Sequence, residues 1–153
     1  ALNSNCTFIG GCEEGSPEEQ WLRRDLAAAK ATCTIAYWHH PRFSSGLHGS
    51  SSTTAALWTA LAENHADIVL SGHDHDYERM VPVDGIRSFV VGTGGAESYP
   101  VLGSIAQSKT VRTFTNGYLK LTLGDGAYAW QFVPVAGFGL NFGPGDTGTG
   151  SCG

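Results

Sequence analysis

Apolar residues follow helical spacing in two segments of the chain. In residues 17–30 they fall on one face, at Trp21, Leu22, Leu26 and Ala29. Ser16 precedes this segment and is followed by a proline and two glutamates, which is typical of a helix N-terminus. A second helix is predicted over residues 54–64, where one face carries Leu57, Trp58 and Leu61.

Shorter apolar runs predict strands that are buried on both faces. There are three of them, at residues 34–38, 67–70 and 87–91. The first lies between the two predicted helices and the second follows the later helix. This order of helix, strand, helix and strand predicts a parallel α/β arrangement.

After these elements the apolar pattern changes to a period of two. Residues 117–123 alternate, a Gly-Asp-Gly turn follows, and residues 127–133 return, which predicts an antiparallel hairpin. The last twenty residues are rich in glycine, proline and threonine, so we expect irregular structure there. No internal repeat or domain boundary interrupts the pattern.

Composition fits one globular domain and excludes some partners. A chain of 153 residues that is 41% hydrophobic can bury a sizeable core. The net charge is −5 and no basic run is present, which disfavours nucleic acid as a partner. No apolar stretch approaches the 18 or so residues of a membrane span, so we expect no membrane partner.

Four cysteines bear on the cellular location. Cys6 and Cys12 flank a Gly-Gly turn and could close a small disulfide loop, which leaves Cys33 and Cys152 to pair or to stay free. Four reduced core cysteines are the alternative. We favour disulfides, and with them a secreted protein in an extracellular or periplasmic setting.

Histidines gather where two predicted strands end. His39 and His40 follow the first strand, and His73 and His75 follow the second. In open α/β sheets, ligands bind beyond the carboxyl ends of the strands. Neutral imidazole is the commonest metal ligand in proteins. The pattern therefore predicts a metal site built from His39, His73 and His75, whereas isolated histidines at strand ends more often have a structural role.

The other polar candidates are less specific. His48 lies in a Ser/Gly-rich loop, residues 44–52, and is either a substrate contact or a solvated side chain. His65 ends the second predicted helix and is expected to be structural. Arg79 is expected to form an ion pair with a carboxylate.

Two motifs resemble those of a known superfamily. Gly72-His73-Asp74-His75 resembles the GHxH motif of calcineurin-like metallophosphoesterases, and Ala36-Tyr37-Trp38-His39 resembles their VxxH motif. The longer matches, residues 37–43 and 72–79, are similar to the purple-acid-phosphatase-like branch, particularly its secreted bacterial members.

This resemblance implies a fold and a set of roles. The family fold is a four-layer α/β/β/α sandwich. Its members hold two divalent or trivalent metal ions (Fe, Zn or Mn) and hydrolyse phosphate esters with a metal-bound hydroxide. By the motif positions, His39 and His73 would bind one metal and His75 the other. His48 lies where related enzymes place a histidine that faces the substrate, so it is the candidate catalytic residue of this chain, and His40 would support the neighbouring ligand.

The chain departs from the family pattern in its acidic motifs. The family's DxH, GDxxY and GNH motifs are absent, although they supply its bridging aspartate, its asparagine ligand and its usual catalytic histidine. We therefore expect residues 1–153 to be a single partial domain, the C-terminal half of the α/β sandwich. Its expected partners are the N-terminal half of the same enzyme, or a second copy, and a small phosphate ester.

Three functions follow from this interpretation. The first is a phosphomonoesterase whose dinuclear site is completed by the N-terminal segment, so that this chain alone would be inactive. The second is a catalytically silent module that binds a metal or ligand. The third is a mononuclear zinc hydrolase contained in this chain, with Asp74 or Asp76 as its base.

Overall fold

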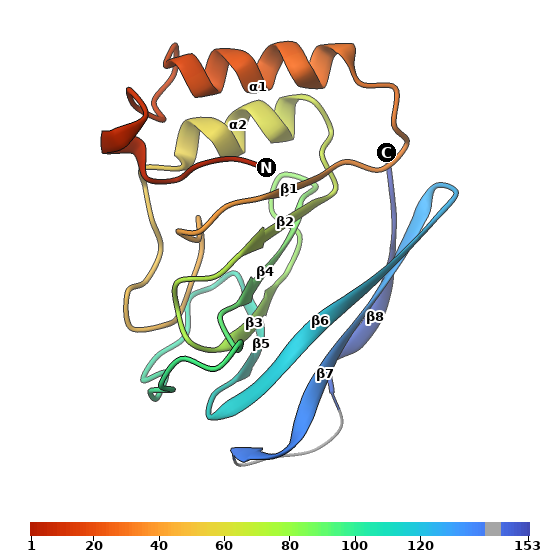
Figure 1. Cartoon of the computed structure of the whole chain (residues 1–153). Coiled ribbons are helices and arrows are strands. Elements are labelled where there is room, and N and C mark those ends of the chain that lie inside the picture. Colours follow the sequence, from red (N-terminus) through yellow and green to blue (C-terminus); the bar gives the residue numbers. More distant parts are fainter. Residues whose placement is uncertain (140–144) are drawn as a thin grey trace.

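A computed structural model describes residues 1–139 and 145–153 of the chain. These residues form two α-helices, a short 3₁₀-helix (Cys6–Phe8) and two β-sheets, and the α-helices and sheets are arranged in three layers (Figure 1). The helices cover one face of a five-stranded sheet, and a three-stranded sheet packs against its other face. The order of layers is α/β/β, and it matches three of the four layers expected from the family resemblance.

Helix α1 (Pro17–Ala28) begins as its sequence predicts. The Ser16 side chain accepts a hydrogen bond from the Glu19 backbone N–H, and Pro17 occupies the first turn. The helix ends at Ala28, two residues before the predicted end, because Ala29 adopts an extended conformation. Leu22 is buried as expected, but Trp21 is 45% exposed. The prediction that Trp21 faces the core was therefore wrong.

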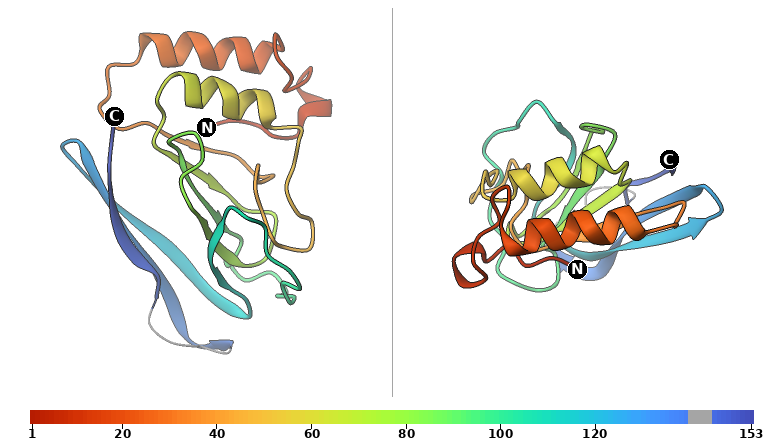
Figure 2. Two further views of the ribbon diagram at one scale, coloured as in Figure 1. Left: turned by 180° about the vertical axis from the view of Figure 1, so that it is seen from behind. Right: turned by 90° about the horizontal axis from the view of Figure 1, so that it is seen from above.

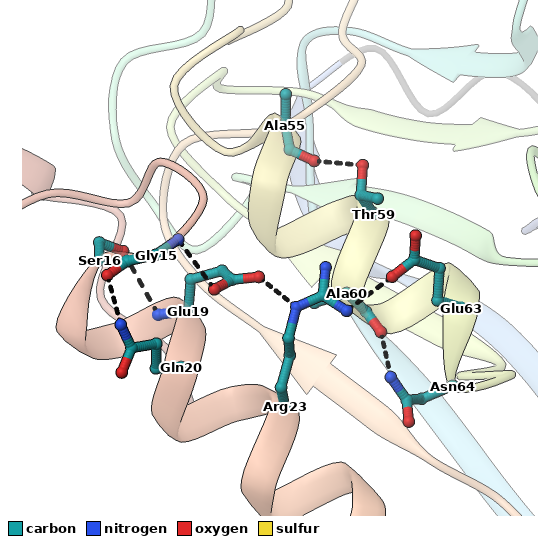
Figure 3. Close-up of polar contacts among 10 residues, drawn as sticks. All are labelled: Gly15, Ser16, Glu19, Gln20, Arg23, Ala55, Thr59, Ala60, Glu63 and Asn64. Carbon is teal, nitrogen blue, oxygen red and sulfur yellow. Dashed lines mark hydrogen bonds and ion pairs between the residues drawn. The ribbon is translucent and has the colours of Figure 1, made fainter.

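Helix α2 (Ala55–Glu63) lies beside α1 and agrees with its prediction (Figure 2). Its buried face carries Leu57, Trp58 and Leu61. Arg23 of α1 joins the two helices, since it donates to Glu19 on its own helix and to Glu63 of α2 at 2.6 Å (Figure 3). The Arg23 guanidinium lowers the pKa of the buried Glu19 carboxyl, which stays charged at neutral pH.

The five-stranded sheet has the order β1-β2-β4-β3-β5. Its parallel part comprises β1 (Ile35–Tyr37), β2 (Ile68–Ser71) and β4 (Arg87–Val91). The pairing of β1 with β2 confirms the predicted parallel α/β arrangement, and β4, which was predicted as a strand, joins them in the parallel sense. The strands β3 (Tyr77–Met80) and β5 (Ser108–Arg112) extend the sheet in the antiparallel sense and were not predicted.

The three-stranded sheet is an antiparallel meander. The predicted hairpin is confirmed in β6 (Thr115–Gly124) and β7 (Ala127–Gly139). Strand β8 (Thr147–Ser151) then pairs with β7, so the expectation of irregular structure over the last twenty residues was wrong for β8 and for the end of β7. Residues 140–144, which belong to the same expectation, lie outside the described part of the chain.

Aromatic side chains fill the space between the two sheets. Tyr77 and Phe89 of the first sheet meet Trp130 and Phe132 of the second. Tyr77 stacks on Phe132 with ring centroids 4.2 Å apart. Such buried rings each contribute a large apolar area, so this layer fixes how the second sheet lies on the first.

The structure has two disulfides: the Cys6–Cys12 bond that the sequence suggested, and a Cys33–Cys152 bond that the sequence had left open. Cys6 pairs with Cys12 in the N-terminal loop, and Cys33 pairs with Cys152 across 119 residues of sequence. The second bond ties the chain beyond β8 to the segment just before β1. It therefore fastens the second sheet to the first.

We expect the Cys33–Cys152 bond to contribute strongly to stability. A cross-link that closes a loop of this length restricts the unfolded chain, and native disulfides typically contribute about 3 kcal/mol. Replacing both cysteines by alanine should lower the free energy of unfolding by about that amount in urea denaturation. The Cys6→Ala/Cys12→Ala pair is the control and should cost less, because its loop is short. Equal losses from the two pairs would contradict this account.

Candidate metal site

The carboxyl ends of β1 and β2 bring two of the predicted ligands together. Because β1 and β2 are parallel neighbours in register, the residues that follow them leave the sheet side by side. The Gly72 N–H donates to the His39 carbonyl at 3.1 Å, which continues the pairing beyond the strands. His39 Nε2 then lies 3.0 Å from His73 Nδ1.

His73 adopts a backbone conformation that favours glycine or asparagine. Its φ is +69°, in the left-handed region. A histidine there costs folding free energy, and such strain clusters at functional sites. The turn after β2 therefore directs the His73 ring toward His39 at a cost to stability.

His40 and Ser4 lie on one side of this pair. Among the described residues, one group offers three possible metal-binding atoms within 4.8 Å of one another: His39, His40 and His73. His40 Nδ1 lies 2.8 Å from the Ser4 hydroxyl, which also accepts from the His40 backbone N–H. This contact holds the His40 ring through one nitrogen and leaves the other available.

His75 lines the same cavity as His39 and His73. The cavity has a volume of about 550 Å³ and is also lined by His48. His75 Nδ1 lies 2.7 Å from the backbone carbonyl of Glu97. Because a carbonyl oxygen can only accept, Nδ1 carries the proton and Nε2 is free to bind a metal. Glu97 had no sequence motif to single it out.

His48 joins the cluster from the loop between β1 and α2. Its ring centroid lies 4.3 Å from that of His73. His48 lines the cavity of about 550 Å³ and also a second cavity of about 290 Å³ that is lined by His40 and Ser50 among others. The loop thus places an exposed imidazole beside the predicted ligands.

The electrostatic environment favours neutral imidazoles. Burial lowers the pKa of His39 below its ordinary value of 6.5, and neighbouring imidazoles lower it further. Burial has the same effect on the pKa of His73, again reinforced by the other histidines and only partly opposed by Asp74. Both rings are therefore in the form that binds metal at neutral pH.

The acidic residues between and beside these histidines do not face the cavity. Asp74 and Asp76 are fully buried. Burial, reinforced by Glu78 and Asp74, raises the pKa of Asp76 to about 7. Both of its carboxyl oxygens are enclosed, and neither has a hydrogen-bond partner among residues 1–139 and 145–153. The cavity that His39, His48, His73 and His75 line has no carboxylate among its described lining residues. The described lining therefore supplies no carboxylate base for a mononuclear hydrolase.

The two remaining predictions concern residues outside the cluster. His65 lies at the end of α2, beside Asp67 and Asp84, and does not line the histidine cavity. Arg79 forms the expected ion pair, and its partner is Asp146 at 2.6 Å. That pair joins the two sheets.

Comparison with protein families gives a match to one part of the chain. Residues 6–77 match the calcineurin-like phosphoesterase family, and this segment includes both histidine clusters. Over this segment the chain is similar to the calcineurin-like phosphoesterases. The C-terminal part, which contains the β6–β8 sheet, lies outside the matched segment.

Curated relatives include tartrate-resistant acid phosphatases. The chain is 29% identical over 105 residues to tartrate-resistant acid phosphatase type 5 of Sus scrofa, an alignment that covers 68% of this chain and 29% of the phosphatase. For the Homo sapiens protein of the same name, identity is 25% over 119 residues, with 76% of this chain and 34% of the phosphatase covered. The chain therefore spans about a third of the length of these relatives.

Solved structures show the same fold. Purple acid phosphatase PPD1 from yellow lupin seeds superposes with a TM-score of 0.75 at 21% identity, covering 91% of this chain and 29% of the phosphatase. GAP50, described as the anchor in the inner membrane complex of Plasmodium, superposes with a TM-score of 0.73 at 22% identity. The superposition covers 95% of this chain and 46% of the GAP50 chain. Within the described residues of this chain, neither helix is long and apolar enough to cross a membrane.

Proposed function

We propose that this chain is part of a metal-dependent phosphomonoesterase. The convergence of His39 and His73, with His75 and His48 lining the same cavity, is the observation that carries the proposal. The family and its acid phosphatase relatives agree with this chemistry. The substrate would be a small phosphate ester.

The histidines fit the nitrogen ligands of a dinuclear centre. His39 and His73 would hold one metal ion and His75, through its free Nε2, the other. The metal ions, when bound, would supply Lewis acidity toward the phosphoryl oxygens and lower the pKa of a bound water. Two cations at close range also need bridging acids, and the cavity described here supplies only imidazoles. The acids would come from the family's upstream motifs.

The other residues of the site would orient the ligands and the ester. The Glu97 carbonyl fixes the tautomer of His75, which is how ordinary metal sites set the direction of an imidazole. The exposed ring of His48 can donate a hydrogen bond to a phosphoryl oxygen that enters the cavity. The close-packed His73 ring would hold the His48 ring in place.

We further propose that the N-terminal half of the enzyme docks along β1 and β6. Each is the edge strand of its sheet, and the two edges border one groove. This groove of about 590 Å³ is lined by Leu70, Val91 and Leu119 and by half-exposed rings of Tyr37 and Tyr118. An apolar groove between two edge strands is a surface that a longer sandwich would cover. A secreted protein would agree with the two disulfides.

The function is tested by comparing the chain alone with a longer protein that includes the upstream acidic motifs. We expect two metal ions and p-nitrophenyl phosphate hydrolysis in the longer protein, and neither full metal content nor activity in the chain alone. Metal content is measured by atomic emission. Activity in the isolated chain would contradict the need for upstream acids, and metal binding without hydrolysis in the longer protein would favour a silent binding module.

Gel filtration tests the proposed docking surface along β1 and β6. Gel filtration of the chain alone should show self-association, because the β1 and β6 edges are uncovered. The longer protein should elute as a monomer. A chain that stays monomeric at high concentration, without binding a hydrophobic dye, would contradict this part of the proposal.

A further inference from the structure

One buried carboxylate connects three segments around the histidines. Asp74 Oδ1 accepts from the His48 backbone N–H and from the Tyr99 hydroxyl, both at 2.8 Å. Its other oxygen accepts from the Ser44 hydroxyl at 2.5 Å. The side chain is fully buried, so these hydrogen bonds do not compete with water. Asp74 therefore holds the loop before α2 and the loop after β4 to the turn after β2.

Tyr99 extends this connection to His75. Its hydroxyl accepts from the His75 backbone N–H at 2.9 Å, while it donates to Asp74. The Tyr99 ring also packs against the His75 ring, with centroids 5.1 Å apart. The same loop supplies the Glu97 carbonyl that receives the His75 Nδ1 proton. The backbone and the ring of His75 are thus both held by residues 97–99.

Two glycines let the backbone close on Asp74. A Cβ at Gly46 would lie 2.2 Å from the Asp74 carboxyl carbon, and a Cβ at Gly92 would lie 1.8 Å from the Asp74 carbonyl oxygen. Neither position has room for a side chain. The loops carrying His48 and Tyr99 therefore approach Asp74 as closely as a polypeptide backbone allows.

We propose that Asp74 and Tyr99 are positioning residues that hold His48 and His75 in the geometry the metal site requires. This proposal rests on the metal-binding role that we proposed above for the site. The hydrogen bonds themselves do not depend on a bound metal. Through Tyr99, Asp74 orients His75; directly, it orients the backbone of His48. In metal sites, loss of such a supporting contact typically lowers metal affinity by about 10–100-fold.

The first test uses the metal-free chain. Hydrogen exchange of the His48 and His75 amides should be slow, because both protons are bonded within the buried connection. Tyr99→Phe should speed exchange at His75 by about tenfold or more, since the acceptor is lost. Tyr128→Phe is the control, because it removes a hydroxyl from a buried tyrosine of the second sheet that lies in the core between the sheets. Unchanged exchange at His75 in Tyr99→Phe would overturn the proposal.

The second test measures Zn²⁺ affinity by competition with a chromophoric chelator. We expect Tyr99→Phe and Asp74→Ala to weaken Zn²⁺ binding at least about tenfold and Tyr128→Phe to leave it unchanged. Asp74→Asn should stay within about threefold of the natural chain, because an amide oxygen still accepts from His48 and Tyr99. Equal losses in Asp74→Asn and Asp74→Ala would mean that the charge of Asp74, rather than its hydrogen bonds, matters.

The outcomes separate this proposal from the proposed function. A longer protein that binds zinc but hydrolyses no phosphate ester would refute the phosphatase and leave the positioning role intact. Tyr99→Phe that binds Zn²⁺ as tightly as Tyr128→Phe would refute the positioning role, whatever the activity. If no form binds Zn²⁺, the amide exchange of the metal-free chain still decides the matter.

Discussion

Replacing His73 by alanine should abolish metal binding at the site and lower phosphate ester hydrolysis by about 1,000-fold or more in the longer protein. A loss of that size corresponds to about 4 kcal/mol of transition-state stabilisation. His73 is central because its ring lies against the rings of His39, His40 and His48. Its removal would take away one ligand and the surface that orients the others. Metal content and the rate of p-nitrophenyl phosphate hydrolysis measure the effect.

His65 offers a matched control for this replacement. It is the other histidine with a left-handed backbone among the described residues, with φ of +55° against +69° for His73. An alanine has a similar backbone strain at either position, so strain alone cannot explain a difference in metal content or rate between the two variants. His65→Ala should keep metal and activity. The asparagine variants, which tolerate this conformation better, should rank in the same way. Retention of metal and rate in His73→Ala would refute the ligand assignment.

Replacing Asp146 by alanine should lower the free energy of unfolding by about 4 kcal/mol. Asp146 accepts from the Tyr77 hydroxyl and from Arg79 Nε, each at 2.6 Å, and from Trp130 Nε1 at 3.1 Å. Arg79 Nη2 donates to its second oxygen at 2.9 Å. The alanine variant would leave a mostly buried guanidinium without its anion, and two other donors without their acceptor. Urea denaturation measures the loss.

The contribution of Asp146 should depend on pH in one direction. Burial alone would raise its pKa, but the hydrogen bonds from Arg79, Tyr77 and Trp130 outweigh burial, and the pKa falls below the ordinary 3.8. A carboxyl with a lowered folded-state pKa stabilises the fold above its unfolded-state pKa and loses that effect as pH falls through the folded-state value. The difference between natural chain and Asp146→Ala should therefore be constant from pH 7 to 5 and shrink below about pH 4.

Asp125 is the control for the Asp146 prediction. It is exposed in the turn between β6 and β7, so Asp125→Ala should change stability by less than about 0.5 kcal/mol. A difference between the natural chain and Asp146→Ala that grows as the pH falls would contradict the assigned sign. A loss in Asp146→Ala no larger than in Asp125→Ala would refute the role of Asp146 in joining the sheets.

The final strand shows why part of the fold could not be predicted. The run Thr147–Ser151 alternates threonine with glycine, a composition typical of a loop. In the structure, Gly148 lies opposite Trp130 and Gly150 opposite Tyr128. A Cβ at either glycine would fall within 2.4 Å of the facing aromatic ring. The glycines make room for rings on a neighbouring strand, and strand propensity contains no information about that neighbour.

Local sequence features were sufficient to predict the elements that short-range interactions stabilise. Capping residues and helical spacing set both helices, apolar runs set the parallel strands, and a Gly-Asp-Gly turn set the hairpin. The sequence also determined that His39 and His73 would meet, because parallel strands end at one edge of a sheet.

Contacts between residues that are far apart in the sequence could be seen only in the tertiary structure. Strand β3 pairs with β5 across about thirty residues, and Arg79 finds its anion 67 residues away. Tyr99 and Glu97 reach the histidines from a loop without a motif. Asp74 lies between two predicted ligands in the sequence, yet its buried side chain accepts hydrogen bonds from Ser44, His48 and Tyr99. Only packing in three dimensions fixes such contacts, since nothing in the local chain favours one distant partner over another.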